Sequence, residues 1–149
     1  MHRKNSGFTL IEIMIVVGIL IILLTLGMPS MLNSRMNANE LNAIANCRTI
    51  SNACQSYYVN SLPHTYPDSL DALISPESDP PYIDSVLASG EKSGYEYTYV
   101  LENAESFYVR ADPVRQNWTG KRYFFADETG VIRASTEGPA GETDVAVSG

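Results

Sequence analysis

The hydrophobic residues of this chain are concentrated near its N-terminus. Residues 8–28 read FTLIEIMIVVGILIILLTLGM, and Glu12 is the only charged residue among them. A helix rises ~1.5 Å per residue, so this segment spans about 31 Å, which matches the hydrocarbon core of a bilayer. The pattern therefore predicts a membrane-spanning helix over residues 8–28.

A second, amphipathic pattern follows between residues 31 and 58, which contain no Gly or Pro. At 100° per residue, its apolar positions fall on one narrow helix face, which collects Leu32, Met36, Ala43, Cys47, Ile50, Cys54 and Tyr57. Joined to the apolar segment, this pattern predicts one helix of about 50 residues, far longer than the average helix of a globular domain. We expect its amphipathic half, residues 29–61, to pack on a sheet.

Gly27 and Pro29 separate the two halves of this helix. Proline removes an amide donor and clashes with the carbonyl group four residues back, here that of Thr25, and glycine is a poor helix former. We expect a kink at Gly27 and Pro29. The alternative is that the helix ends where it leaves the membrane, which a proline also marks.

The remaining chain carries the alternating pattern of half-buried strands. This pattern is clearest from Tyr95 to Leu101, where tyrosines occupy every second position. Further strands are expected over residues 106–111, 122–126 and 131–134, short helices over 69–74 and 83–88, and a flexible tail over 135–149. The predicted fold class is α+β: a long N-terminal helix packed on a small antiparallel sheet of three to four strands, with a globular head over residues 62–134.

Charge constrains both the topology and the function. His2, Arg3 and Lys4 precede the apolar segment, and basic residues stay on the cytoplasmic side, so the head is expected on the opposite side. The 149 residues carry a net charge of −7, which argues against a nucleic-acid partner. After residue 7 the only histidine is His64, and no nucleophile elbow or phosphate-binding loop is found, so neither an enzyme nor a cofactor is expected.

Glu12 is the candidate functional residue of the apolar segment. A carboxylate at membrane depth is costly, and such residues usually serve a function. A cleaved secretory signal has a shorter apolar region of about 7–15 residues, and a plain signal anchor gives no reason for a carboxylate. The alternative is that Glu12 only extends toward the lipid headgroups.

Cys47 and Cys54 are the two cysteines of the chain. Seven residues apart on one helix, their Cα atoms would be ~10.5 Å apart, beyond the ~7 Å limit for a disulfide. We expect two buried thiols that pack as small apolar groups. A disulfide between two chains in an oxidising compartment is the alternative.

The start of the apolar segment resembles a known processing site. Residues 6–12 read SGFTLIE, which is similar to the cleavage site of type IV prepilins and type II secretion pseudopilins. The resemblance implies that prepilin peptidase cuts between Gly7 and Phe8, removes the leader 1–7 and leaves Phe8 to be N-methylated. It also implies that the apolar helices polymerise, with Glu12 pairing the Phe8 amine of a neighbouring subunit.

The same resemblance implies a pilin-like lollipop shape, a set of partners and a location. The partners are prepilin peptidase, identical and minor pilin subunits, an inner-membrane assembly platform, and membrane lipid before assembly. The protein would cross the inner membrane once, with its head in the periplasm, and then join a pilus or pseudopilus. Major, G-type pseudopilins share a calcium site near the C-terminal end, to which Glu142 and Asp144 could contribute oxygens. A minor or priming subunit, or a membrane-anchored binding domain that never polymerises, are the alternatives.

Overall fold

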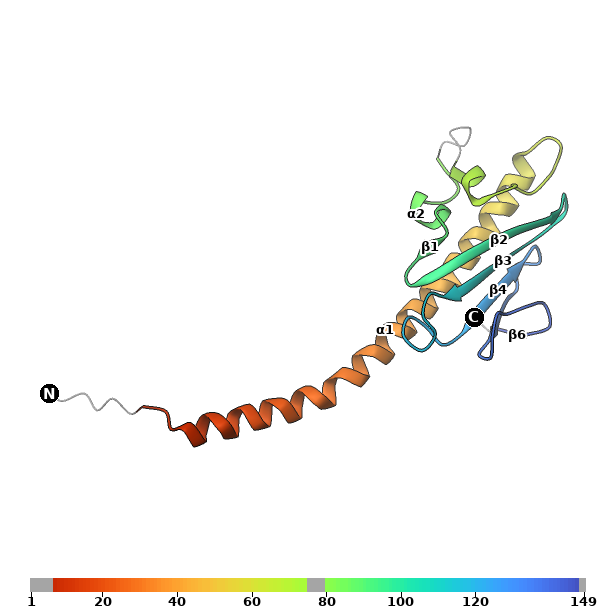
Figure 1. The fold of residues 1–149 in the computed structure, drawn as a ribbon. Helices are drawn as coiled ribbons and strands as arrows, with labels where there is room; N and C mark the ends of the chain where they lie inside the picture. The colour runs from red at the N-terminus through yellow and green to blue at the C-terminus, as the bar shows by residue number, and fades with distance from the viewer. Residues whose placement is uncertain (1–6, 75–79, 148–149) are drawn as a thin grey trace. The chain divides into compact units, whose positions relative to one another are not determined.

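The computed structural model describes residues 7–74 and 80–147, apart from the side chains of residues 26–29. Two compact units are present, one ending at Ser34 and the other beginning at Arg35. The helices are α1 (Leu10–Asn60), the 3-10 helix η1 (Leu70–Ile74) and α2 (Ser85–Ala88). The strands are β1 (Glu91–Lys92), β2 (Tyr95–Asn103), β3 (Ser106–Pro113), β4 (Tyr123–Asp127), β5 (Ile132–Ser135) and β6 (Val145–Ala146) (Figure 1).

Helix α1 confirms the expected long helix, with 51 residues from Leu10 to Asn60. Its start is fixed by Thr9, whose carbonyl oxygen accepts hydrogen bonds from the amides of Glu12 and Ile13 at 3.1 and 3.3 Å. The Thr9 hydroxyl oxygen also accepts from the amide of Glu12 at 3.3 Å. A threonine followed three residues later by glutamate is the capping-box pattern, so the local sequence explains why the helix begins here.

The six described strands form one antiparallel sheet in sequence order, each paired with the next. The four longer strands match the predicted ones. The prediction of three to four strands missed β1 and β6, which have two residues each and show too little alternation to detect. Strand β6 lies within residues 135–149, which we expected to form a flexible tail, and pairs there with β5.

The C-terminal half of α1 packs on one face of this sheet, behind β2, β3 and β4 in Figure 1. The predicted apolar stripe of the helix is confirmed, because Met36, Ala43, Cys47, Ile50 and Cys54 are all buried. The last four of these residues form one core with alternate residues of the central strands, including Tyr95, Tyr97, Phe107, Val109, Ala111 and Phe124. The alternating tyrosines of β2 thus face the helix, as the period-two pattern indicates.

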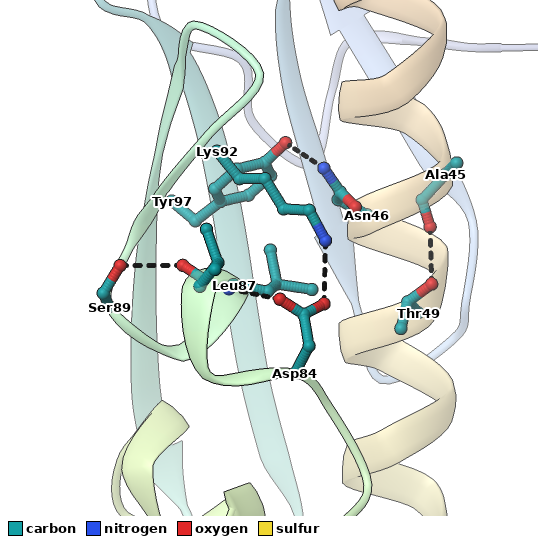
Figure 2. Close-up of polar contacts among 9 residues, drawn as sticks. Ala45, Asn46, Thr49, Asp84, Leu87, Ser89, Lys92 and Tyr97 are labelled. Carbon is teal, nitrogen blue, oxygen red and sulfur yellow. Dashed lines mark hydrogen bonds and ion pairs between the residues drawn. The ribbon is translucent and has the colours of Figure 1, made fainter.

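Polar contacts border this core between α1 and β2 and between α2 and β1 (Figure 2). The side-chain amide of Asn46 donates to the Tyr97 hydroxyl oxygen at 2.8 Å. Asp84 caps α2 by accepting from the amide of Leu87 at 3.0 Å, and its other oxygen lies 2.7 Å from Nζ of Lys92. The hydrogen bond from Lys92 is the main reason that the pKa of Asp84 lies below its usual value. The Asp84–Lys92 ion pair thus links the start of α2 to β1.

Candidate functional site

Apolar side chains cover every side of α1 before residue 26. The exposed fraction of the large ones ranges from 47% at Val16 and Val17 to 79% at Leu10. A helix that packs on its own domain needs only one apolar stripe, whereas a helix apolar on all sides is buried in lipid or among other chains. By length and composition, α1 contains a stretch that can cross a membrane.

Gly7 and Phe8 precede this helix. Residues 7–9 have no regular secondary structure, and the Phe8 side chain is 76% exposed. The predicted scissile bond between Gly7 and Phe8 therefore lies in accessible, non-helical backbone, the kind of segment in which proteolytic cleavage concentrates. The other residues of the predicted leader, 1–6, lie outside the described part of the chain.

Glu12 lies in the first turn of α1, and its side chain is exposed. The positive end of the helix dipole stabilises a carboxylate at this position by about 0.3–1 kcal/mol. Within residues 7–74 and 80–147, no basic side chain forms an ion pair with Glu12. Since Phe8 lies outside α1, Phe8 and Glu12 are not i, i+4 neighbours on one helix.

Gly27 and Pro29 both lie within α1, which continues to Asn60. The alternative in which the helix ends at the membrane surface is therefore wrong. The side chains of residues 26–29 lie outside the described part of the structure, so the kink at Gly27 and Pro29 remains a prediction.

A part-buried ion pair in the head was missed from the sequence. The Glu40 residue is 5% exposed, and its Oε2 lies 2.7 Å from Nε of Arg122. Its Oε1 accepts from the backbone amides of Lys121 and Arg122 at 2.9 and 3.4 Å. Glu40 on α1 and Arg122 before β4 are 82 residues apart. No local sequence pattern predicts an ion pair between residues so far apart.

Further contacts hold the loop between β3 and β4 against α1. The side-chain amide of Asn39 donates to the carbonyl oxygen of Thr119, and the Tyr95 hydroxyl donates to that of Arg122, both at 2.8 Å. Gly120 lies so close to Tyr95 that a Cβ atom there would stand 2.0 Å from the tyrosine oxygen. We call Asn39, Glu40, Thr119, Gly120 and Arg122 the loop clamp.

Cys47 and Cys54 are free thiols and both are buried. Burial raises the pKa of each thiol to about 12, which leaves almost no reactive thiolate at neutral pH. The expectation of two buried thiols is confirmed. A disulfide between two chains would require one of these sulfurs to leave the core.

Glu142 and Asp144 are not brought together with a third potential ligand. In the part of the chain that the structure describes, no group of three or more His, Cys, Asp or Glu side chains could hold a metal ion. Oδ2 of Asp144 instead accepts from the amide of Gly141 at 2.8 Å.

A comparison with protein families matches the region that contains Gly7, Phe8 and Glu12. Residues 2–28 fit the model of the prokaryotic N-terminal methylation motif. The chain carries an N-terminal methylation motif. This motif covers the predicted cleavage site, the carboxylate and Gly27, while Pro29 follows directly after it.

Curated relatives of this methylation-motif chain come from type II secretion. The chain is 35% identical to type II secretion system core protein G of Vibrio cholerae over 79 residues, which cover 52% of this chain and 54% of that protein. It is 30% identical to core protein G of Escherichia coli over 95 residues, covering 62% and 61% of the two chains. The chain thus spans about half to three-fifths of the length of these relatives. No solved structure matches it significantly. The resemblance predicted from residues 6–12 is confirmed.

Proposed function

We propose that this chain is a structural subunit of a type IV pilus or pseudopilus. In this proposal prepilin peptidase cleaves after Gly7, Phe8 is N-methylated, and the subunits polymerise through their apolar helices. The observation that carries the proposal is the methylation motif at the start of a helix whose apolar side chains are exposed on every side. The similarity to type II secretion system core protein G favours a secretion pseudopilus over a surface fibre.

The mechanism rests on a charge pair that cleavage creates. Removal of the leader leaves a cationic amine on Phe8, and methylation keeps that charge. Lipid tails are as apolar as the side chains of α1, so exchanging lipid for neighbouring subunits gains little hydrophobic free energy. An unpaired Glu12 carboxylate is costly at membrane depth, and pairing it with the Phe8 amine of a neighbour removes that cost. Glu12 thereby favours one axial stagger between subunits.

The partners follow from this mechanism. Membrane lipid surrounds residues 8–28 before assembly, and prepilin peptidase meets the Gly7–Phe8 bond on the cytoplasmic side. An inner-membrane assembly platform and identical or minor pilin subunits then receive the processed chain. The head faces the periplasm, because the basic residues before the span stay in the cytoplasm.

Intact mass spectrometry of the full chain from its host tests the processing step. The expected mass is that of a chain beginning at Phe8 with one added methyl group. A chain that still begins at Met1 contradicts the proposal.

Glu12→Ala tests the assembly step, with Glu91→Ala as the matched control because Glu91 is an exposed carboxylate of the head. We expect normal cleavage but a loss of most filaments with Glu12→Ala, and no loss with the control. Wild-type filament yield from Glu12→Ala would refute the role of this carboxylate. Scarcity of the chain in sheared filaments would indicate a minor or priming subunit, and its absence from filaments would favour a membrane-anchored binding domain.

A further inference from the structure

The sheet face opposite α1 carries an unusual row of residues. Strand register aligns Thr98, Arg110, Phe125 and Arg133 on β2, β3, β4 and β5. Phe125 is 4% exposed, although it is not part of the core that packs on α1. Its neighbour Phe124 belongs to that core, and successive strand residues point to opposite faces. Phe125 is therefore buried on the outer face, with an arginine on each adjacent strand.

Neither of these two arginines forms an ion pair among the described residues. The Nε atoms of Arg110 and Arg133 are buried and have no hydrogen-bond acceptor among the described residues. Nη1 of Arg133 makes one long contact, 3.5 Å from the carbonyl oxygen of Asp144. The two ion pairs found in the described residues use Lys92 and Arg122 instead. Buried donors without acceptors are rare in native proteins because they cost free energy.

Asp112 does not form an ion pair with either arginine. It lies on the same face, two residues beyond Arg110 on β3, but no oxygen of Asp112 approaches Arg110 closely enough to form an ion pair. One of its oxygens is itself buried without a partner, and Glu96 stands directly opposite on β2. Burial raises the pKa of Asp112, and the nearby charge of Arg110 only partly opposes this shift.

The geometry of the row suits carboxylate groups. Adjacent strands are ~4.8 Å apart, so the backbones of Arg110 and Arg133 are separated by about 10 Å across Phe125. A guanidinium binds a carboxylate through two parallel hydrogen bonds. The Phe125 ring between the two arginines is buried and stacked on Tyr108 with centroids 5.6 Å apart, which makes this part of the sheet closely packed. We call Arg110, Phe125 and Arg133 the arginine row.

We propose that the arginine row binds acidic side chains of a second copy of this chain. The inference rests on the proposed function, which brings many copies together through their apolar helices. The chain itself supplies the complementary charge, with seventeen Asp and Glu against ten Lys and Arg. Several carboxylates of the head are exposed and have no ion pair in the described residues, among them Asp68, Asp71, Glu102 and Glu105.

Photo-crosslinking in the host membrane tests this interface. A photoreactive amino acid replaces Thr98, which is exposed and lies opposite Arg110 on the neighbouring strand, next to the arginine row. We expect a crosslinked dimer of the full chain, with the crosslink mapping to an acidic segment of the second copy. The double variant Arg110→Gln and Arg133→Gln should lower the dimer yield about tenfold, while Arg115→Gln, at an exposed arginine of the β3–β4 loop, should leave it unchanged.

A second variant separates binding from folding. Arg110→Lys with Arg133→Lys keeps both charges but loses the paired hydrogen bonds, so the dimer yield should fall between those of wild type and the glutamine variant. A crosslink that is absent, insensitive to both double variants, or directed to lipid or another protein overturns the arginine row. If the mature chain still begins at methylated Phe8 in that case, the proposed function stands and only this inference fails.

Discussion

Substitution of Glu40 is the sharpest test of how the head is held together. Glu40→Ala removes both carboxylate oxygens and so leaves the amides of Lys121 and Arg122 and the Arg122 guanidinium without their acceptor. Glu40→Gln keeps one side-chain oxygen for the amides and removes only the charge. The pair of variants therefore separates the loss of hydrogen bonds from the loss of the ion pair.

The contacts set the expected magnitude. Breaking a fully buried ion pair costs about 3–5 kcal/mol, but the side chain of Arg122 is 35% exposed and can regain water. We therefore expect Glu40→Ala to lower the free energy of unfolding by about 2–4 kcal/mol, including the cost of the unpaired amides. Glu40→Gln should cost about half as much. For a head of this size, 1 kcal/mol corresponds to a few degrees in Tm, so Glu40→Ala should lower Tm by about 10 °C.

Thermal unfolding of the full chain in detergent, followed by near-UV circular dichroism, measures these effects. Asp71→Ala is the matched control, because Asp71 is an exposed carboxylate in η1 and should change the free energy of unfolding by less than about 0.5 kcal/mol. A double-mutant cycle with Arg122→Ala should give a coupling energy of about 1–3 kcal/mol. If Glu40→Ala behaves like the control, or the cycle shows no coupling, the loop clamp does not stabilise the head.

Two further predictions concern the core of the head. Gly120→Ala places a Cβ atom against the Tyr95 hydroxyl, so the same melting experiment should show a free energy of unfolding lower by about 2–4 kcal/mol. The control Gly141→Ala has open space around its Cβ position and should change the free energy of unfolding little. Equal stability of the two variants would contradict the close packing of Gly120 against Tyr95. Cys47 and Cys54 should resist a thiol reagent at pH 8 in the native chain and react in guanidinium, because burial raises the pKa of both thiols from 9.0 to about 12. The folded thiols hold their protons more tightly than the unfolded ones, so the free energy of unfolding should fall as the pH rises from about 9 to 12. Rapid labelling of the native chain, or a free energy of unfolding that does not fall over this range, would refute the burial of the two thiols.

Local patterns explain which parts of the fold could be predicted. Helix α1 and strand β2 repeat their apolar positions over many residues, and each repeat adds to the same conclusion. Strands β1 and β6 have two residues each, which is too few to show an alternation of apolar and polar positions. The pairing of Arg133 with Ala146 depends on where the chain returns after β5, and the Gly- and Pro-containing residues between them show no periodicity.

The same distinction applies to the functional residues. Gly7, Phe8 and Glu12 lie within one stretch of six residues, so a linear sequence motif is enough to identify them. The Glu40–Arg122 pair and the arginine row bring together residues from separate elements, and only the strand register shows that Arg110 and Arg133 flank one phenylalanine. A buried carboxylate on α1 next to an apolar stripe looks, in sequence, like any polar helix position.

The two halves of α1 obey different physical rules although they belong to one helix. From Met36 onward, burial returns every three or four residues, which is enough for packing on the sheet. Before residue 26 no such stripe exists, so the environment that suits this segment lies outside the chain. In the proposed function, lipid and neighbouring apolar helices suit this segment almost equally, so little hydrophobic free energy would separate a membrane-bound subunit from an assembled one. The choice between the two states then depends on the few polar groups of the segment, and Glu12 is its only charged side chain.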